Sequence, residues 1–561
     1  MHHIIKVVVR WIASSAIKLL RVPAVSKGIV RVPFLHRRIN RFVINRMALV
    51  TRTRPHPFST QSAFTSWSSL TDKTWSARHL PVSAIDQSSL PGWEGENGLR
   101  PLFERQDGEQ RMCPKSTLLF VTFAQYLTDG FIRTVPEKDP DTGSADEENR
   151  KRNTSNHEID MCPLYGRTVD QTNALRIQNP SPAERGRLRS QEIDGEEFPP
   201  FLFENGVVNP VYDVLDTPLG LREIIQNCES DNPAIATYAK FIRDKLFAVG
   251  GDRVNSVPQV SLMNTLWLRE HNRLAFELAS QHESWSDDQV FETARNIVIV
   301  EFIKVVVEDY INHIAPIAVP LMADSSIAWE APWNKANWIT TEFSLLYRWH
   351  ALVPDSIRWG DSDYSMGPGY LMNNMPLITS GLKRAFEDLS SQKAAELGPR
   401  NTNERLVEIE NNSIRQGRIC QLASYNEYRK YLGRKPVSNF SAVSSDPFVV
   451  SQLERAYRDV DEIDFFVGIF CEDRIVDSPL PQTIFSFVAL DAFTQALTNP
   501  LLSEHVFSTG SNSKDSTFSS YGNEQIRSCK SLKDIVMRNI KDADNLGFVG
   551  MTQQGWVPSR N

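Results

Sequence analysis

Closely spaced cysteines and long apolar runs are both scarce in this chain of 561 residues. The six cysteines are spread over more than 400 residues without a close pair, so neither a zinc site nor a disulfide-rich module is expected. In the first thirty residues, lysine or arginine interrupts every apolar stretch well short of the ~20 residues that a membrane-spanning helix needs. These absences exclude a transmembrane helix in that stretch and predict free thiols.

Acidic residues are also absent from the first 71 positions, which contain twelve lysines and arginines. The rest of the chain has 49 basic and 68 acidic residues, and this negative charge argues against nucleic-acid binding. The mixture of apolar and basic residues in 1–32 favours a helix on a membrane surface; a cleaved transit peptide and a helix packed on the body are the alternatives. No convincing secretory signal is present, so we predict an intracellular protein, cytoplasmic or peripheral to a membrane.

Helical patterns dominate the rest of the chain, and strand patterns are scarce. Pro258 begins one long helical pattern, and a capping sequence at Ser286 begins another, which is apolar on almost every side through Val307. Charged and turn-forming residues in 135–160, and Ser, Gly and Asn in 506–532, predict surface loops. The chain is therefore predicted to be mainly α.

A third helix, predicted over about 338–352, places a tyrosine and a histidine together. Tyr347 and His350 are three positions apart, which would put them side by side on one helix face. A neutral imidazole is a good iron ligand, and a buried phenol beside a haem can form a tyrosyl radical. Taken alone, such a pair on an apolar helix is more often a pair of satisfied core residues.

Two longer motifs raise the significance of this pair. TLWLREHNRLAFEL (265–278), followed some seventy residues later by LYRWHALVPD (346–355), resembles the animal haem peroxidase and cyclooxygenase superfamily. Four further stretches are similar to those of prostaglandin G/H synthases: FAQYLTDGFIRT (123–134), IDGEEFPP (193–200), VEDYINH (307–313) and SYNEYRK (424–430). The likeness is greatest to the cyclooxygenase branch.

The resemblance implies a domain organisation and a cofactor. A haem peroxidase-like catalytic domain would cover 33–505, with the haem between central helices, after a basic segment over 1–32 and before a C-terminal extension over 506–561. The cofactor would be haem b held without covalent bonds, because no CxxCH attachment motif is present. The resemblance also implies a homodimer.

The resemblance assigns roles to individual residues. His350 matches the proximal haem ligand, and Tyr347 matches the tyrosine whose radical abstracts hydrogen from a fatty acid. Gln125 matches the distal glutamine that hydrogen-bonds a peroxide. Tyr310 matches a tyrosine that hydrogen-bonds the radical tyrosine, and Thr494 matches the serine that aspirin acetylates in the mammalian enzymes.

Two positions on the predicted distal side depart from the cyclooxygenase pattern. Asp129 stands where the family has the histidine that carries the peroxide proton, so we expect slower peroxide cleavage. Tyr126 or Asp129 itself are candidates to replace that histidine in part. Arg253 matches a distal arginine of the peroxidases and the plant α-dioxygenases, and its charge would polarise a peroxide; an ordinary surface or helix-cap arginine is the alternative.

The predicted carboxylate site departs from the family as well. Strict register with VPFLHRRINRF (32–42) puts His36 where cyclooxygenases have the arginine that pairs with the fatty-acid carboxylate. Arg37 or Arg38 would bind a carboxylate better, because a guanidinium forks onto two oxygens. A solvated basic face is the alternative, and Ile317 replaces the tyrosine that the family has at the same channel mouth.

These assignments predict a haem-dependent dioxygenase, an enzyme that combines a polyunsaturated fatty acid with O2. The favoured reaction is that of a cyclooxygenase, which forms a prostaglandin endoperoxide from arachidonate or a similar acid. An α- or linoleate-type fatty-acid dioxygenase that stops at a hydroperoxide is the first alternative. The second is a haem peroxidase-like protein without lipid oxygenation.

Overall fold

The structure is a computed structural model that describes residues 20, 22–50, 73–105, 108–136, 145–329, 331, 333–334, 336–367, 369–503, 506 and 517–559. The chain is mainly helical, with 51% helix and 9% strand, which confirms the predicted fold class. In the described ranges, strands occur only as antiparallel pairs: β1 (Met112–Thr117) with β8 (Lys393–Ala395), β2 (Gln191–Ile193) with β3 (Glu196–Phe198), β4 (Phe203–Glu204) with β5 (Val207–Val208), and β6 (Ser356–Trp359) with β7 (Ser362–Ser365).

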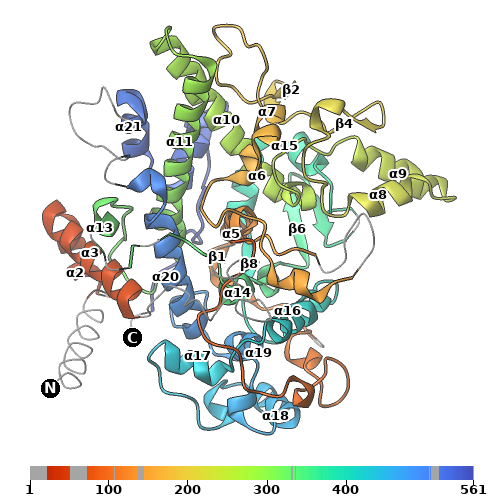
Figure 1. Cartoon of the computed structure of the whole chain (residues 1–561), viewed down its shortest axis with the longest axis vertical. Helices are drawn as coiled ribbons and strands as arrows, with labels where there is room; N and C mark the ends of the chain where they lie inside the picture. The colour runs from red at the N-terminus through yellow and green to blue at the C-terminus, as the bar shows by residue number, and fades with distance from the viewer. Residues whose placement is uncertain are drawn as a thin grey trace.

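The helices account for most of the ordered chain (Figure 1). In chain order they are α2 (Pro23–Val30), α3 (Pro33–Val50), α5 (Leu118–Phe131), α6 (Cys162–Tyr165), α7 (Val169–Leu175), α8 (Leu221–Cys228), α9 (Pro233–Arg243), α10 (Pro258–Gln281), α11 (Asp287–Val305), α12 (Asn312–Ile314), α13 (Ser326–Trp329), α14 (Thr341–Leu346), α15 (Met375–Ser391), α16 (Val407–Ile419), α17 (Tyr425–Tyr431), α18 (Pro447–Ala456), α19 (Phe465–Cys471), α20 (Gln482–Leu497), α21 (Ser519–Ser528) and α22 (Leu532–Asn539).

Helices α10 and α11 pack against each other and form much of the upper half of the molecule in Figure 1. Pro258 occupies the first turn of α10, where its missing N–H is not needed. Ser286 caps α11 by accepting the N–H of Gln289, so both predicted helix starts are confirmed. α11 continues into a π-helical turn over Val306–Ile311, which carries Tyr310. Around α10 pack α5, α15 and α22, which places these two helices inside the main core.

The helix predicted over 338–352 is wrong in its second half. α14 ends at Leu346, and the 3₁₀ turn η8 (His350–Leu352) follows after three residues outside the helix. The indole N–H of Trp349 donates to the carbonyl of Leu346 at 2.6 Å. A continuing helix would use that carbonyl for the N–H of residue 350, so the indole competes with the next helical bond. Tyr347 and His350 therefore do not share a helix face.

The two predicted loops are more structured than expected. In 506–532, α21 packs on α11, because Gly522 allows close approach to Ile297 and Phe518 and Ile526 are buried. This corrects the loop prediction there, while residues 507–516 lie outside the described part. In 135–160, the described residues include one 3₁₀ turn, Glu147–Lys151, and the buried side chains of Asn153 and His157. Tertiary burial thus orders segments whose composition indicates turns.

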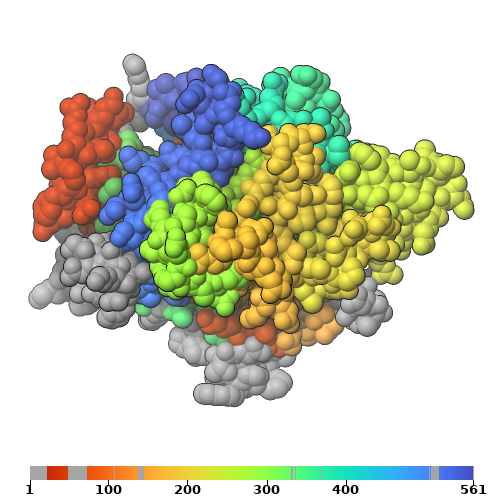
Figure 2. All heavy atoms as spheres, turned by 90° about the horizontal axis from the view of Figure 1, so that it is seen from above, coloured from red at the N-terminus to blue at the C-terminus, as the bar shows by residue number. Residues whose placement is uncertain are grey.

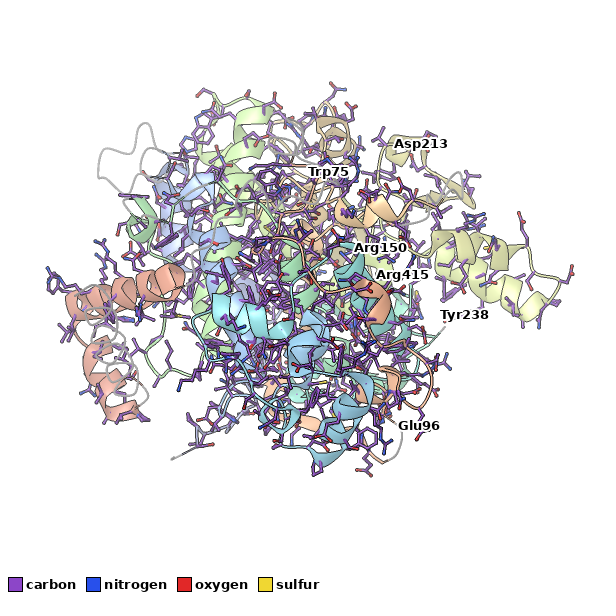
Figure 3. The ribbon with its side chains drawn as sticks, turned by 60° about the horizontal axis from the view of Figure 1, so that its bottom comes forward. Trp75, Glu96, Arg150, Asp213, Tyr238 and Arg415 are labelled. Atoms are coloured by element: carbon purple, nitrogen blue, oxygen red, sulfur yellow. The ribbon has the colours of Figure 1, made fainter. Side chains whose placement is uncertain are left out.

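Two peripheral units lie on opposite sides of the molecule (Figure 2). On one side, α3 packs on α20, and both α2 and α3 bond the segment near residue 320. On the other, α8 and α9 form a hairpin with a small core of its own, and Figure 3 shows it projecting from the body, with Tyr238 of α9 labelled. The C-terminal residues 517–559 contribute to the main core through α21, α22 and Met551, whose carbonyl accepts the N–H of Thr117. The predicted boundaries at 32/33 and 505/506 stay predictions.

Three expectations about absences can be compared with the described ranges. There, no helix is both long and apolar enough to cross a membrane. The six cysteines are free thiols, and all are buried. Within the same ranges, no cluster of three or more His, Cys, Asp or Glu side chains has metal-binding geometry. The predicted membrane-surface helix before residue 20 lies outside the described residues.

Candidate active site

His350 is held by a buried carboxylate. Its Nδ1 lies 3.2 Å from Oε1 of Glu410, which α16 supplies from its first turns. A carboxylate only accepts, so Nδ1 donates and Nε2 carries the free lone pair. Nε2 makes no hydrogen bond to any residue that the structure describes, and the side chain is 21% exposed. This imidazole is suited to hold a metal through Nε2.

Tyr347 is surrounded by aromatic rings. Its ring centroid lies 4.8 Å from that of Trp349 in a stacked pair, and 5.0 Å from that of Phe343 in an edge contact. The Tyr347 hydroxyl is buried and has no hydrogen-bond partner. Burial raises the pKa of this phenol; contact with Tyr310 lowers it in part, and the charge of Asp491 adds a smaller rise. The phenol is therefore neutral, with its hydroxyl buried.

Tyr310 lies next to Tyr347. Burial and then the neighbouring Tyr347 raise the pKa of Tyr310 well above its ordinary value. Both hydroxyls are buried, and neither has another hydrogen-bond partner in the described residues. The Tyr310 ring stacks on Phe120 with centroids 5.4 Å apart. Contact with Tyr310 in turn lowers the pKa of Tyr347, and the hydrogen bond predicted between the two tyrosines stays a prediction.

On the predicted distal side, α5 presents Gln125 and Asp129 one turn apart. The Gln125 amide makes only a long contact of 3.5 Å with the Ser256 hydroxyl, and its side chain is partly exposed. Asp129 is buried, and its Oδ2 has no partner. Burial, and then Asp252, raise the pKa of Asp129 to about 6, against the opposing charge of Arg253.

Arg253 belongs to this distal group and is not a free surface arginine. Its Nη1 lies 3.6 Å from Oδ1 of Asp129. The same Nη1 donates to the carbonyl of Ile132 at 3.0 Å. The Tyr126 hydroxyl instead donates to Asn264 at 3.1 Å. Of the two candidates to replace the distal histidine, only Asp129 keeps an unpartnered polar atom.

Arg348 interacts electrostatically with charged groups on both sides of the site. It was not among the residues predicted from the sequence. Burial lowers the pKa of its guanidinium to about 10, and the charges that act on it include Arg253, Glu410 and Asp129. Its Nε has no hydrogen-bond partner. The available signal was an arginine between a tyrosine and a histidine inside an apolar stretch. Glu410 was missed too, and no local pattern could reveal it, because it lies 60 positions from His350.

These residues fit a haem. The iron needs a nitrogen lone pair, which Nε2 of His350 offers. The haem propionates need nearby cations, and the guanidinium of Arg348 has an unsatisfied Nε. A ligand on the iron needs hydrogen-bonding groups, which Gln125 and Asp129 carry. The unpartnered buried atoms of the site are therefore of the kinds that a haem and its ligand would bind.

The residues predicted at the channel mouth have different environments. The His36 ring is buried and bonds the Pro320 carbonyl through Nε2 at 2.6 Å, so it fastens α3 to the body. Arg37 and Arg38 are exposed on α3, and the Arg38 guanidinium lies over the Phe34 ring. Thr494 is buried, and its hydroxyl donates to carbonyls of its own helix. Of the three basic residues, only the two arginines are available to a ligand.

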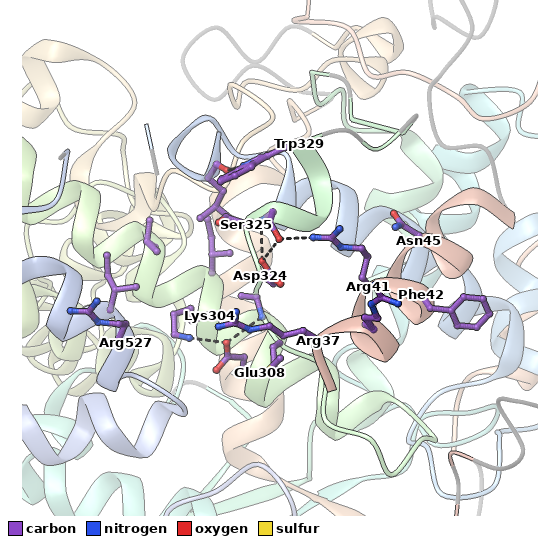
Figure 4. A pocket seen from close by; sticks show the side chains of 18 of the residues that line it. Arg37, Arg41, Phe42, Asn45, Lys304, Glu308, Asp324, Ser325, Trp329 and Arg527 are labelled. Carbon is purple, nitrogen blue, oxygen red and sulfur yellow. Dashed lines mark hydrogen bonds and ion pairs between the residues drawn. The ribbon is translucent and has the colours of Figure 1, made fainter. Parts of the chain in front are cut away.

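Arg37 and Arg38 line a large basic cleft of about 1300 Å³ between α3, α11 and α13 (Figure 4). Figure 4 shows Arg37 reaching from α3 toward Lys304 and Glu308, which pair with each other at 2.7 Å. Six basic side chains line the cleft, against two acidic ones: Arg37, Arg38, Arg41, Arg46, Lys304 and Arg527 against Glu308 and Asp324. Apolar walls complete it: Phe34, Phe42, Val300, Ile303, Trp329, Leu502 and Ile526. This combination suits an anionic amphiphile.

The sequence profile of the animal haem peroxidase family matches residues 122–547, so the chain belongs to that family. It is 28% identical over 526 residues to prostaglandin G/H synthase 1 of Rattus norvegicus, covering 92% of this chain and 80% of that protein. Its fold is similar to fatty acid α-dioxygenase of Arabidopsis thaliana (TM-score 0.64, 14% identity, 93% and 89% of the two chains). Peroxidase A of Dictyostelium discoideum is another structural neighbour (TM-score 0.61, 19% identity, 84% and 94%). The resemblance predicted from the motifs is confirmed, and members of this family bind haem.

Proposed function

We propose that this oxidoreductase is a fatty-acid oxygenase of the cyclooxygenase type, which forms a prostaglandin endoperoxide from O2 and arachidonate or a similar polyunsaturated acid. The observation that carries the proposal is the arrangement of Tyr347 and His350. A phenol with a buried hydroxyl lies three residues before an imidazole whose Nε2 has no partner in the described residues. Likeness to a prostaglandin G/H synthase over 92% of the chain supports the same reaction.

In this proposal His350 holds haem b through Nε2, without covalent attachment. The bound haem supplies the oxidising equivalents, which it draws from a peroxide. The Tyr347 phenol then gives up one electron and one proton. The resulting phenoxyl takes a hydrogen atom from an activated C–H bond of the acyl chain, which restores the phenol. O2 adds to the carbon radical that remains, and the final peroxyl radical takes the hydrogen atom back from Tyr347, which regenerates the phenoxyl. Apolar walls hold the chain in position.

The distal residues would handle the peroxide. Gln125 is free to donate a hydrogen bond to it, because its present contact is long. The burial that raises the pKa of Asp129 to about 6 lets this carboxyl hold or release a proton near neutral pH, as the family's histidine would. Arg253 adds positive charge 3.6 Å from that carboxyl. Asp129 and Arg253 together would take the place of the family's distal histidine.

We propose that Arg37, with Arg38 beside it, binds the carboxylate of the fatty acid. Both line the basic cleft, whereas the His36 ring is already bonded to Pro320. A guanidinium can form two parallel bonds to a carboxylate. The apolar cleft walls would receive the start of the acyl chain. Thr494 and Tyr310 remain candidates for contact with the chain deeper in the protein.

The α2–α3 unit is the proposed contact with a membrane surface. Its exposed side chains include six large apolar residues among basic ones: Val22, Val30, Val32, Phe34, Leu35 and Phe42. Apolar residues exposed beside arginines and lysines are typical of helices that lie in a lipid interface.

We also propose a homodimer, which light scattering of the purified protein would test.

A fatty-acid dioxygenase that releases a hydroperoxide is the second candidate. Arg253 supports this candidate, because it lies 3.6 Å from Asp129 and matches a distal arginine of the peroxidases and α-dioxygenases. A peroxidase-like protein without lipid oxygenation is the third candidate, which Asp129 in place of the histidine favours.

Oxygen uptake by the haem-reconstituted protein with arachidonate tests all three. We expect two O2 per acid and an endoperoxide by mass spectrometry in the wild type, and none in Tyr347→Phe with its haem retained. Tyr364→Phe is the matched control, since Tyr364 lies on β7 and is expected to leave uptake unchanged. One O2 per acid would instead establish the dioxygenase, and no uptake the peroxidase-like protein.

A further inference from the structure

The carboxylate of Glu410 is buried beside His350 without a cation bound to it. Its side chain is 3% exposed, and its only ion-pair partner in the described ranges is the imidazole itself. Oε1 accepts from Nδ1 of His350 at 3.2 Å and from the Thr402 hydroxyl at 3.3 Å. Oε2 has no hydrogen-bond partner. A carboxylate buried in this way is costly, and its strongest compensation is the imidazole N–H.

Regular secondary structure holds Glu410 more firmly than it holds His350. Glu410 projects from α16, and Thr402 is buried with its N–H bonded to the carbonyl of Phe103 at 3.1 Å. His350 instead begins the short turn η8, after the interruption that Trp349 causes. Backbone geometry therefore defines the imidazole orientation less than a continuous helix would, and the bond to Glu410 supplies the missing constraint.

We propose that Glu410 is a positioning residue that orients His350, selects the tautomer with Nε2 free, and makes the imidazole a more strongly electron-donating ligand. An N–H that donates to a carboxylate leaves more negative charge on the ring, which raises the basicity of the other nitrogen. A more basic ligand stabilises the more oxidised state of the iron. This inference rests on the proposed haem site and adds the proximal residue that adjusts its redox behaviour.

The variant Glu410→Gln tests the inference with little change of shape. Its amide oxygen can still accept the Nδ1 proton, but the charge is lost. We expect the variant to keep its haem, to show a lower iron–histidine stretching frequency in the resonance Raman spectrum of the reduced protein, and to have a higher haem reduction potential. Peroxide turnover should fall about 10- to 100-fold, as is typical when a partner of a metal ligand is replaced.

Glu408→Gln is the matched control on the same helix. Glu408 is exposed and accepts from the Trp93 indole, so its variant should leave the stretching frequency and the potential unchanged. Glu410→Asp keeps the charge on a shorter side chain and should recover part of both values. An unchanged frequency and potential in haem-bound Glu410→Gln would overturn the inference.

Thr402→Val provides a second test if Glu410→Gln does not fold. Loss of the Thr402 hydroxyl leaves the His350 imidazole as the remaining hydrogen-bond donor to the Glu410 carboxylate. The carboxylate should then act more strongly on the imidazole and lower the haem reduction potential slightly. A rise in the potential would contradict the inference. Failure of the haem site itself has a different signature: wild-type protein would take up no haem, or His350→Ala would keep the wild-type spectrum.

Discussion

The indole of Trp349 stacks on the phenol of Tyr347, with ring centroids 4.8 Å apart and planes inclined by 30°. The same indole donates its N–H to the Leu346 carbonyl at 2.6 Å, and so takes the acceptor that the next helical bond would use. One side chain thus packs the proposed radical tyrosine and ends the helix before His350. The helix break leaves the imidazole with a hydrogen bond to Glu410 in place of a position on the helix face.

The unbonded hydroxyl of Tyr310 predicts that Tyr310→Phe stabilises the protein. A buried hydroxyl without a partner costs about 1–3 kcal/mol, and phenylalanine removes it without leaving a large cavity. We expect the free energy of unfolding in urea to rise by about 1 kcal/mol. Tyr165→Phe is the control, because its hydroxyl bonds Nδ1 of His271 at 3.0 Å, and it should lose about 1 kcal/mol. Destabilisation by Tyr310→Phe would indicate a bond between the two tyrosines in solution.

Replacing Asp129 by histidine should raise peroxidase activity. An imidazole titrates nearer to neutrality and would restore the proton transfer that the family's distal histidine performs, which is typically worth ~10²–10⁴-fold. Allowing for imperfect geometry beside Arg253, we expect at least about a 10-fold gain for Asp129→His in a guaiacol assay with hydrogen peroxide. Fast wild-type turnover, unchanged by the substitution, would contradict this account of the distal side.

The raised pKa of Asp129 predicts a specific dependence of stability on pH. The folded protein holds the proton up to about pH 6, whereas an aspartate ordinarily loses it near 3.8. Between these pH values the folded state binds more protons than the unfolded state, so this group lowers stability as pH rises. The loss reaches about 3 kcal/mol by pH 7.

Asp129→Asn removes that titration, and the comparison with wild type isolates it from other buried acids. Relative to wild type, the variant should become more stable by up to about 3 kcal/mol between pH 4 and pH 7, measured by urea unfolding. Parallel pH profiles for the two proteins would show that Asp129 titrates with its ordinary pKa.

The basic cleft predicts that Arg37→Gln raises the KM for arachidonate. Loss of one exposed charge-assisted contact should raise KM about 3- to 10-fold at low salt with little change in kcat. In wild type, KM should increase with ionic strength, because salt screens the exposed charges. Arg458→Gln is the control, since Arg458 is exposed and does not line the cleft. An equal KM for wild type and Arg37→Gln would remove Arg37 from the substrate site.

Sequence alone determined the features that depend on local order. Pro258 and Ser286 mark the starts of the two central helices, because a proline and a capping serine act on their own first turn. The motifs LWLREHNR and YRWH and the spacing between them indicated the family. The resemblance then made Tyr347, His350 and Gln125 candidates for the site. Cysteine spacing also predicted free thiols, and helical patterns predicted a mainly helical chain.

Tertiary structure decided what depends on contacts between distant segments. The end of α14 depends on a side-chain hydrogen bond that helix propensity does not contain. The bond of His36 to Pro320 spans 284 positions, and that of His350 to Glu410 spans 60. The helix α21 forms in a loop-like composition because Ile526 is buried in the main core. In each case burial changes which polar group needs a partner, and only the folded chain determines which partner is near.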